Sequence, residues 1–336
     1  MDTLTHIALG ACTGEAMLGK QLGRKALLIG AFANTIPDFD FIASFWLKVD
    51  EALLAHRGFT HSFLFAVLIS VCMALLFKRW LRAYKISFKI WMLFFATEIF
   101  LHLLIDAFNA YGVGWFEPFS HYRVSFNTIF VADPFYSAWL GIACLMLLVL
   151  KKDHAKRKFW VRFGLGISSL YFMYCVVNKI KTDTDIKDIL QHQHISYNKY
   201  FSTPTPLNNW LWYVAAGNDS GFNVGYYSVF DSKKQIYFHY FPRNDSLLNP
   251  VRDHEDLYRL IRFSKGFYTI EKWSDTLVFN DLRFGQMIGW ERPDAKFVFH
   301  YFLQHKDDNE LVVQRGRFAN WDWRATRSLI KRIEGN

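Results

Sequence analysis

The sequence has few of the residues that mark disordered, fibrous or disulfide-linked proteins. Of its 336 residues only 8 are proline and 4 are cysteine, and its 19 glycines follow no Gly-X-Y period. Apolar residues make up 52% of the chain and aromatic residues 18%. This composition excludes a disordered or low-complexity protein, and the lack of any repeat excludes fibrous classes.

The cysteines do not support a disulfide framework. All of them lie in apolar segments in the first half of the chain, at Cys12, Cys72, Cys144 and Cys175. The C-terminal half therefore has none to pair, and we interpret the four as small apolar residues at helix contacts. We also expect no cleavable signal peptide, because the first segment lacks a basic start and contains His6 and Glu15.

Charge is sparse and unevenly distributed. Charged residues make up 21% of the chain. Residues 1–181 contain 19 Lys and Arg against 11 Asp and Glu, a net charge of +8, whereas residues 182–336 contain 20 against 19. A nucleic-acid binder gathers its basic residues on one folded face. Here they form short clusters between apolar runs, which indicates membrane flanks and no nucleic-acid partner.

Long apolar runs fill the first half. Four of them approach or exceed the roughly 20 residues that cross a bilayer, and two shorter ones precede them. The long runs are 59–77, 88–108, 130–150 and 159–180, and the short ones are 4–18 and 26–36. We therefore predict an α-helical membrane domain of about six membrane-embedded helices, two of them short, over residues 1–181.

The basic clusters predict the orientation of these helices. They lie between the two short runs, between the first two long runs and between the last two, at 20–25, 78–89 and 151–162. Short loops rich in Lys and Arg stay in the cytoplasm. With six segments, this rule places both termini and everything after the last run outside the cytoplasm.

The second half has the pattern of a soluble α+β domain. Short runs rich in Tyr, Phe and Val, separated by Gly, Asp and Asn, predict an antiparallel sheet from strands at 223–230, 235–241, 267–272, 276–279 and 296–304. Helices are predicted at 253–264 and 324–333. We expect this extracytoplasmic domain to cover residues 182–336. Its histidines share no ligand spacing, and His192 with His194 fits a solvated linker better than a metal site.

Three aromatic residues near the start of this domain allow two interpretations. Trp210, Trp212 and Tyr213 follow the last apolar run closely. Trp and Tyr anchor proteins at membrane interfaces, but ordinary core packing fits these residues equally well.

Ionisable residues inside the apolar half indicate a functional site, because they are costly there. They are His6, Asp38, Asp40, His56, His61, Glu98, His102, Asp106 and Asp133. His102 and Asp106 are four residues apart, so they share one helix face. Asp38 and Asp40 flank a turn at Pro37, and Thr60 is placed to cap the helix that follows His61.

The predicted orientation places all these groups at the outer membrane surface. Imidazole and carboxylate ligands without thiolate suit Zn, Mn, Fe or Ni. So many of them at one depth predict a metal site with one or two divalent ions, Zn first and Mn or Fe as alternatives. Such a site activates water, which makes hydrolysis of an ester or phosphoester the natural chemistry.

Several neighbouring residues each allow two interpretations. Glu98 is either a carboxylate that orients a ligand imidazole or a packing acid. Asp133 before Pro134 is either a ligand or a helix cap. Arg57 and Arg123, with His121 and Tyr122, bind either a substrate phosphate or lipid headgroups.

Four motifs carry a family resemblance. They are Asp-Thr-Leu-Thr-His at 2–6, Pro-Asp-Phe-Asp at 37–40, His-Arg-Gly-Phe-Thr-His-Ser at 56–62 and His-Leu-Leu-Ile-Asp at 102–106. In order and spacing over about residues 1–150 they resemble the bacterial membrane-bound metal-dependent hydrolases, whose better-known members are inner-membrane proteins described as LexA-regulated. Asn109, Gly112 and the pair Asp133–Pro134 also fit that pattern.

This resemblance implies a metal site and a location. The implied ligands are His6, Asp38, Asp40, His56, His61, His102 and Asp106. The implied location is the bacterial inner membrane, with several passes. A more distant likeness to zinc-dependent phospholipases C points toward lipid phosphoesters.

The sequence therefore predicts a membrane-embedded hydrolase that acts on a lipid or lipid-linked ester. Asp38 and Glu98 are the candidate proton carriers, and Arg57 is the candidate anion-binding residue. The alternatives are a transporter, or a metal-sensing or structural membrane protein without activity. A transporter is disfavoured because its polar groups would line the membrane midplane, often in paired repeats.

Overall fold

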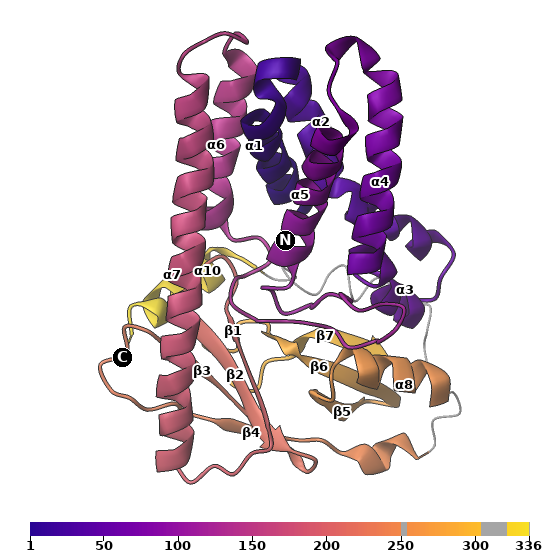
Figure 1. Ribbon diagram of the computed structural model, residues 1–336. Coiled ribbons are helices and arrows are strands. Elements are labelled where there is room, and N and C mark those ends of the chain that lie inside the picture. Colours follow the sequence, from indigo (N-terminus) through magenta and orange to yellow (C-terminus); the bar gives the residue numbers. More distant parts are fainter. Residues whose placement is uncertain (250–253, 304–320, 336) are drawn as a thin grey trace. The chain divides into compact units, whose positions relative to one another are not determined.

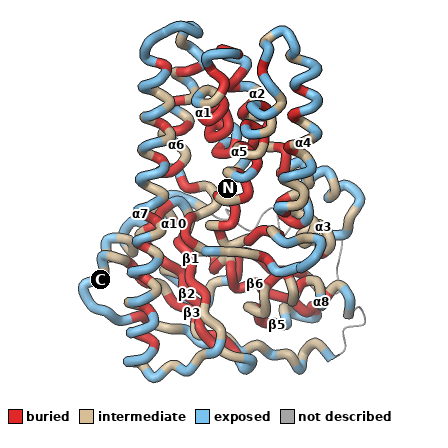
Figure 2. The backbone as a smooth tube through the Cα atoms, in the orientation of Figure 1, coloured by how far each residue is buried: buried red, intermediate tan, exposed pale blue. Residues whose placement is uncertain are grey.

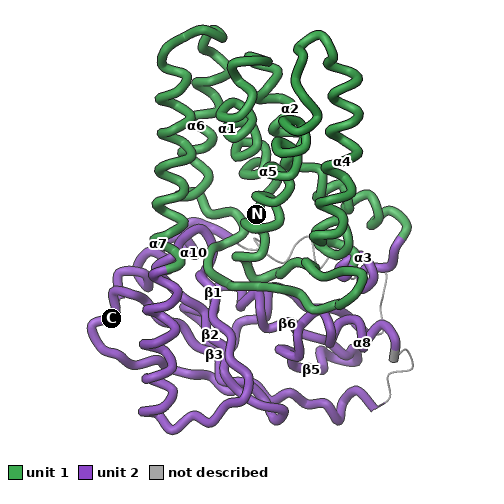
Figure 3. Tube along the Cα trace, in the orientation of Figure 1, with its two compact units in different colours: residues 1–46, 55–176 green, residues 47–54, 177–336 purple. Residues whose placement is uncertain are grey.

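The computed structural model describes residues 1–249, 254–303 and 321–335. The chain divides into two compact units (Figure 3). Unit 1 contains Met1–Trp46 and Ala55–Val176, and unit 2 contains Leu47–Leu54 and Val177–Asn336.

Unit 1 is built from helices (Figure 1). In chain order they are α1 (Thr3–Leu22), α2 (Arg24–Thr35), the 3-10 segment η1 (Ile36–Phe45), η2 (Phe59–His61), α4 (Phe63–Trp80), η3 (Arg82–Tyr84), α5 (Phe88–Asp106), α6 (Pro134–Val149) and the first part of α7 (Arg157–His192). Within the described residues, four stretches are long and apolar enough to cross a membrane: Arg24–Phe45, Phe63–Trp80, Phe88–Asp106 and a part of Arg157–His192. The predicted helical membrane region is therefore confirmed.

Helix ends differ from the predicted runs for local reasons. α2 continues directly into η1, so the second run is not short but a stretch of 22 residues. α6 begins only at Pro134, because Asp133 caps it by accepting from the backbone N–H groups of Phe135 and Tyr136. Ser62, not Thr60 as predicted, caps α4 by accepting from the N–H of Phe65. α7 runs twelve residues past the apolar run, to His192.

Small residues bring α1 and α2 together. Gly10 and Gly14 of α1 face Gly30 of α2, and a Cβ atom added to Gly10 would stand 2.3 Å from the carbonyl oxygen of Gly30. Backbones approach this closely only where neither helix carries a side chain. The contact matters for function because His6 and Asn34 lie one turn beyond Gly10 and Gly30.

Unit 2 contains two antiparallel sheets (Figure 1). The first has the order β1-β2-β3-β4, with β1 (Lys199–Pro204), β2 (Leu211–Asn218), β3 (Gly221–Ser228) and β4 (His239–Pro242). The second has the order β5-β6-β7, with β5 (Tyr268–Trp273), β6 (Thr276–Gln286) and β7 (Phe297–Phe302). Its helices are α8 (His254–Phe263), α10 (Trp323–Ile333) and the end of α7, with the 3-10 turn η4 (Asp245–Leu248), and α3 (Val49–Ala55) lies mostly in this unit.

The antiparallel α+β prediction is confirmed, with corrections. The sequence patterns missed β1 and β2, and they ended the strand at 276–279 seven residues too early. Residues 235–238, the first part of a predicted strand, form no strand. Residue 253, the start of a predicted helix, and residue 304, the end of a predicted strand, lie outside the described residues. Trp212 and Tyr213 belong to β2 and are buried in the core, which decides between the two interpretations of these aromatics. Figure 2 shows the buried stretches of the β-strands and of α1, α2 and α5.

Candidate metal centre

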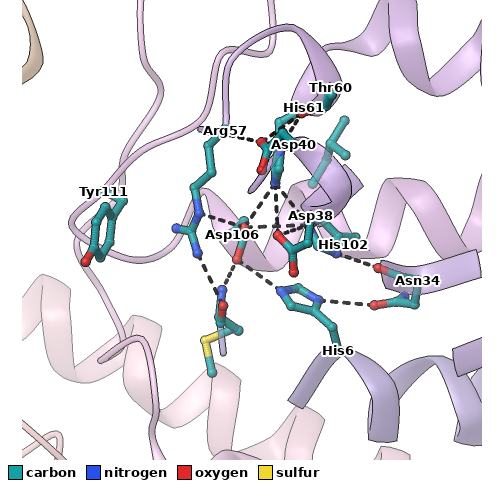
Figure 4. Close-up of polar contacts among 12 residues, drawn as sticks. His6, Asn34, Asp38, Asp40, Arg57, Thr60, His61, His102, Asp106 and Tyr111 are labelled. Atoms are coloured by element: carbon teal, nitrogen blue, oxygen red, sulfur yellow. Dashed lines mark hydrogen bonds and ion pairs between the residues drawn. The ribbon is translucent and has the colours of Figure 1, made fainter. Parts of the chain in front are cut away.

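Four side chains bring their donor atoms together in unit 1 (Figure 4). Asp38 comes from the first turn of η1, His61 from the end of η2, and His102 and Asp106 from the last turns of α5. One donor atom from each lies within 4.8 Å of the other three. His61, His102 and Asp106 are fully buried, and 16% of the Asp38 side chain is exposed.

Local structure explains how these residues meet. Four residues on a helix make about one turn, so His102 and Asp106 project from the same face of α5. Pro37 starts η1 and directs Asp38 inward, while Phe39 and Phe41 on the same segment are exposed. η2 lies just before the start of α4, and His102 and Asp106 lie at the end of α5.

The spacings between the donor atoms suit a bound cation. The Nε2 atoms of His61 and His102 are 3.1 Å apart. Asp106 Oδ2 lies 3.4 and 3.6 Å from these two nitrogens, and Asp38 Oδ1 lies 3.6 and 3.5 Å from them. Ligands about 2.0–2.2 Å from a tetrahedral metal are roughly 3.3–3.6 Å from one another. The four residues therefore form a group that could hold a metal ion.

Hydrogen bonds on the far side of each ring favour metal binding. His102 Nδ1 donates to the backbone carbonyl of Asn34 at 2.5 Å. His61 Nδ1 faces the Asp40 carboxylate at 3.4 Å and the Thr60 hydroxyl at 3.0 Å. These acceptors hold a proton on Nδ1 and leave the lone pair on Nε2. Two such lone pairs 3.1 Å apart repel one another unless a proton or another cation lies between them.

A buried carboxylate oxygen also favours a bound cation. Asp106 Oδ2 is buried and receives no hydrogen bond, although Arg57 Nε lies 3.1 Å away in an ion pair. A buried anionic oxygen without a hydrogen-bond donor is costly. The oxygen points toward the two Nε2 atoms, and a bound cation would satisfy all three.

The remaining predicted ligands lie beside the four donors. Asp40 accepts from His56 Nδ1 at 2.9 Å, from the Arg57 N–H at 2.8 Å and from the Thr60 hydroxyl at 2.9 Å. It therefore holds the loop that carries His61. His6 stacks on His102, with ring centroids 3.8 Å apart, and its Nε2 lies 3.2 Å from Asp106 Oδ1. The side chain of His56 is 42% exposed.

Asn34 is a central residue of this region that the sequence patterns missed. It is fully buried, its Oδ1 lies 3.1 Å from His6 Nδ1, and its backbone carbonyl accepts from His102. Its amide nitrogen donates to Glu98 Oε2 at 3.1 Å and to the Glu98 carbonyl at 2.8 Å. Glu98 therefore contacts Asn34 rather than the four donor atoms. A search restricted to ionisable residues overlooks Asn34, although a lone asparagine in an apolar helix is itself a signal.

The two arginines have internal partners. Arg57 Nη1 donates to Asn109 Oδ1 at 2.8 Å, and Nη2 donates to the Met1 carbonyl at 3.2 Å. The Met1 amino group in turn contacts Asp106 Oδ1. Arg123 donates to the backbone carbonyls of His56 at 2.8 Å and Gly112 at 3.1 Å. Both guanidinium groups thus position the loops around the four donors.

Asp133 and His121 stand apart from this arrangement. Asp133 caps α6 and accepts from the Tyr171 hydroxyl at 3.0 Å, which supports the cap interpretation of this residue. His121 lies 2.8 Å from Glu117 and is largely exposed. Neither belongs to the group of four donors.

Comparison with known protein families identifies relatives of the helical region that contains the four donors. A family model described as "YdjM inner membrane protein" matches residues 1–181. Inner membrane protein YbcI of Escherichia coli (strain K12) is 31% identical over 122 residues, which are 36% of this chain and 69% of YbcI. The uncharacterized protein YfhP of Bacillus subtilis (strain 168) is 34% identical over 144 residues, 40% of this chain and 42% of YfhP. No solved structure matches the chain.

Proposed function

Because the chain belongs to the YdjM inner membrane protein family, we propose that its four converging donors hold one divalent metal ion and that the protein is a membrane-embedded hydrolase. The observation that carries this proposal is the convergence of the His61 and His102 Nε2 atoms, 3.1 Å apart, on Asp106 Oδ2, a buried oxygen that receives no hydrogen bond.

Donor geometry supports one ion rather than two. Among the described residues, the four donors of Asp38, His61, His102 and Asp106 form a single converging group. Zinc fits the imidazole and carboxylate donors, and manganese or iron are the alternatives.

The chain's own residues prepare this site in three ways. Asp40 and Asn34 fix the rings of His61 and His102 with Nε2 directed inward. Arg57 offsets the charge of Asp106. Asp38 is the donor with exposed surface, so water enters beside it, and it is our candidate to accept the proton of that water. A divalent cation at this position activates water for hydrolysis.

We propose a lipid or lipid-linked ester as the substrate class. The support is the dual character of η1: Asp38 and Asp40 point inward, while Phe39, Phe41 and Phe45 expose aromatic surface on the same ten-residue segment. A substrate whose ester group reaches Asp38 would thus keep its apolar part against these aromatics. The basic clusters at 78–89 and 151–162 support an outward-facing site and an extracytoplasmic unit 2.

A structural metal is the second candidate, and the number of donors favours it. Four protein ligands fill a tetrahedral zinc ion, whereas catalytic zinc normally keeps one position for water. Hydrolysis at this site therefore requires a metal with five or six ligands. The two candidates predict the same metal content but different activity.

The test measures metal and activity on the same samples. Purified wild type is compared with His61→Ala and with the control His56→Ala, which removes an imidazole that is not among the four donors. We expect one ion per chain in wild type and control and none in His61→Ala, together with metal-dependent cleavage in a panel of phospholipid and lipid-linked esters. Full metal in His61→Ala would refute the site, and stoichiometric metal without any cleavage would refute the hydrolase.

A further inference from the structure

Helix α10 has an exposed face that combines apolar and basic residues. The helix starts where Asp322 accepts from the Ala325 N–H, and it buries Ala325 and Leu329 against unit 2. On the opposite face Trp323 is 69% exposed and Ile330 is 50% exposed. These two residues are seven apart, which is two helical turns, so they form one apolar line.

Basic residues run beside this line. Arg324 and Lys331 are also seven residues apart and are exposed, and Arg327 lies between the two lines. Acidic residues lie at the two ends of the helix, Asp322 at its N-cap and Glu334 at its C-cap. Apolar and aromatic residues together with Lys and Arg on one helix are typical of helices that lie in a membrane interface.

A neighbouring turn extends the same surface. Phe230 follows β3 and is 56% exposed. Arg332 of α10 forms an ion pair with the adjacent Asp231, with Nη1 2.7 Å from Oδ1, and the Ser228 hydroxyl donates to the Ile333 carbonyl. The C-terminal half of α10 and Phe230 are therefore held together, and we call Trp323, Arg324, Arg327, Ile330, Lys331 and Phe230 the α10 surface.

Contacts within unit 2 place this surface near the membrane end of the unit. Ser228 of β3 pairs with Leu211 of β2, which directly follows Asn209 and Trp210. Asn209 Oδ1 accepts from Asn178 Nδ2 at 2.9 Å, and Asn178 lies on α7 just where its apolar run ends. The other end of α7 lies away from this contact: Gln193, just beyond the helix, donates to the Ile236 carbonyl at 3.1 Å, and Ile236 lies against Gly225 in the middle of β3.

We propose that the α10 surface docks on the anionic lipid surface of the membrane that the chain crosses. The basic line complements phosphate headgroups, and Trp323, Ile330 and Phe230 reach the boundary of the acyl chains. Trp212 and Tyr213 do not serve this purpose, because both are buried in β2. The proposal is independent of the chemistry at the metal centre.

The experiment uses the full chain in lipid nanodiscs, with its four cysteines replaced by alanine. An environment-sensitive fluorophore is attached at Trp323→Cys or, as the control, at Tyr237→Cys. Tyr237 is equally suitable for labelling because it is 78% exposed, and it follows Ile236, whose carbonyl accepts from Gln193 just beyond the C-terminal end of α7. The nanodiscs contain phosphatidylcholine with or without phosphatidylglycerol, plus a lipid that carries a doxyl quencher on its acyl chain.

We expect a blue-shifted and quenched probe at 323, stronger with phosphatidylglycerol, and neither effect at 237. The triple variant Arg324→Gln, Arg327→Gln, Lys331→Gln should reduce the docked-to-undocked ratio by roughly 100-fold, since each basic residue near an anionic surface contributes about fivefold. Equal quenching at 323 and 237 would overturn the proposal. Quenching at 323 that is unaffected by phosphatidylglycerol and by the triple variant would overturn the choice of an anionic surface. A blue shift at 323 without doxyl quenching would mean that protein covers the helix, which also overturns it.

Discussion

Replacing Gly10 with alanine tests whether the close contact of α1 and α2 supports the metal centre. The new Cβ would stand 2.3 Å from the carbonyl oxygen of Gly30 and 2.5 Å from Asn34 Cβ. Cβ atoms in proteins essentially never lie under 3.0 Å from such neighbours. The obstacles are a backbone carbonyl and the first side-chain atom of Asn34, so no rotamer change relieves the clash, and the helices must separate by close to 1 Å.

The expected cost follows from this overlap. Forcing extra volume into a packed contact destabilises by about 1–3 kcal/mol. Alanine also favours a helix over glycine by up to about 1 kcal/mol, which acts in the opposite direction. Gly141→Ala is the matched control, because a Cβ there meets nothing within 4 Å. We expect a net loss of about 1–2 kcal/mol for Gly10→Ala and a neutral or slightly positive effect for the control.

The assay has two readouts. Unfolding in mixed micelles gives the stability of each variant, and metal affinity shows whether the strain reaches the centre. Separation of the helices lengthens the 3.1 Å contact between His6 Nδ1 and Asn34 Oδ1 and moves the Asn34 carbonyl that holds His102. We therefore expect weaker metal binding in Gly10→Ala as well. If Gly10→Ala and Gly141→Ala have the same stability, the α1–α2 contact is not as close as described here.

Three further outcomes follow from single contacts. Asp40→Asn should weaken metal binding about 10–100-fold in a chelator competition without loss of helix content, because Asp40 orients His61 but is not one of the four donors; unchanged affinity would contradict that role. Arg157→Leu should destabilise unit 1 by about 3–5 kcal/mol, because it leaves Glu15 buried without its partner, and Glu15→Leu in the same chain should recover most of the loss. Burial lowers the pKa of His300 below its usual value of about 6.5, so the unfolded chain binds the proton more readily than the folded chain. Protection of β7 from hydrogen exchange should therefore be full above about pH 6.5 and fall as the pH drops below it. His300→Phe should remove this dependence of the protection on pH.

Helices were predictable where composition alone decides them. α4 and α5 follow the apolar runs at 59–77 and 88–108 closely, because a long apolar stretch in lipid must satisfy its backbone internally. The ends of α2 and α7 were not predictable in this way. η1 adds Asp38 and Asp40 to an otherwise apolar stretch, and α7 continues into the Lys- and Asp-rich residues 181–188, where contacts within unit 2 maintain the helix.

The missed strands lack the pattern that identifies a strand. β1 ends in Ser-Thr-Pro, and β2 contains Ala215, Ala216 and Gly217, residues with low strand preference. Both are nevertheless paired along their whole length, from Lys199 with Gly217 to Pro204 with Trp212. Burial between neighbouring elements decided their structure, and that information is not local to the segment.

The separate roles of the residues in the candidate metal centre could not be predicted from the sequence. Spacing placed His102 and Asp106 on one face, the predicted orientation brought Asp38 to the same membrane surface, and all three are among the four donors. The same reasoning treated Asp40 and His56 as equals of these residues. Their separate role depends on which atom faces which, since Asp40 approaches Nδ1 of His61 whereas Asp38 approaches Nε2. No sequence pattern shows which of the two ring nitrogens of His61 each carboxylate approaches.

An ionisable residue in an apolar segment is a weaker indicator of function than an unsatisfied donor or acceptor atom. Glu15 lies in an apolar helix as Asp106 does, yet both its oxygens accept from Arg157, at 2.8 and 2.7 Å, and Arg157 also donates to the carbonyls of Leu147 and Leu150. That group is saturated and joins α1 to α6 and α7. Asp106 Oδ2 receives no hydrogen bond and lies opposite two imidazole lone pairs. The ion pair with Arg57 and the contact with the Met1 amino group offset the charge of Asp106 but leave Oδ2 without a hydrogen bond, and this difference from Glu15 supports a cation site at Asp106.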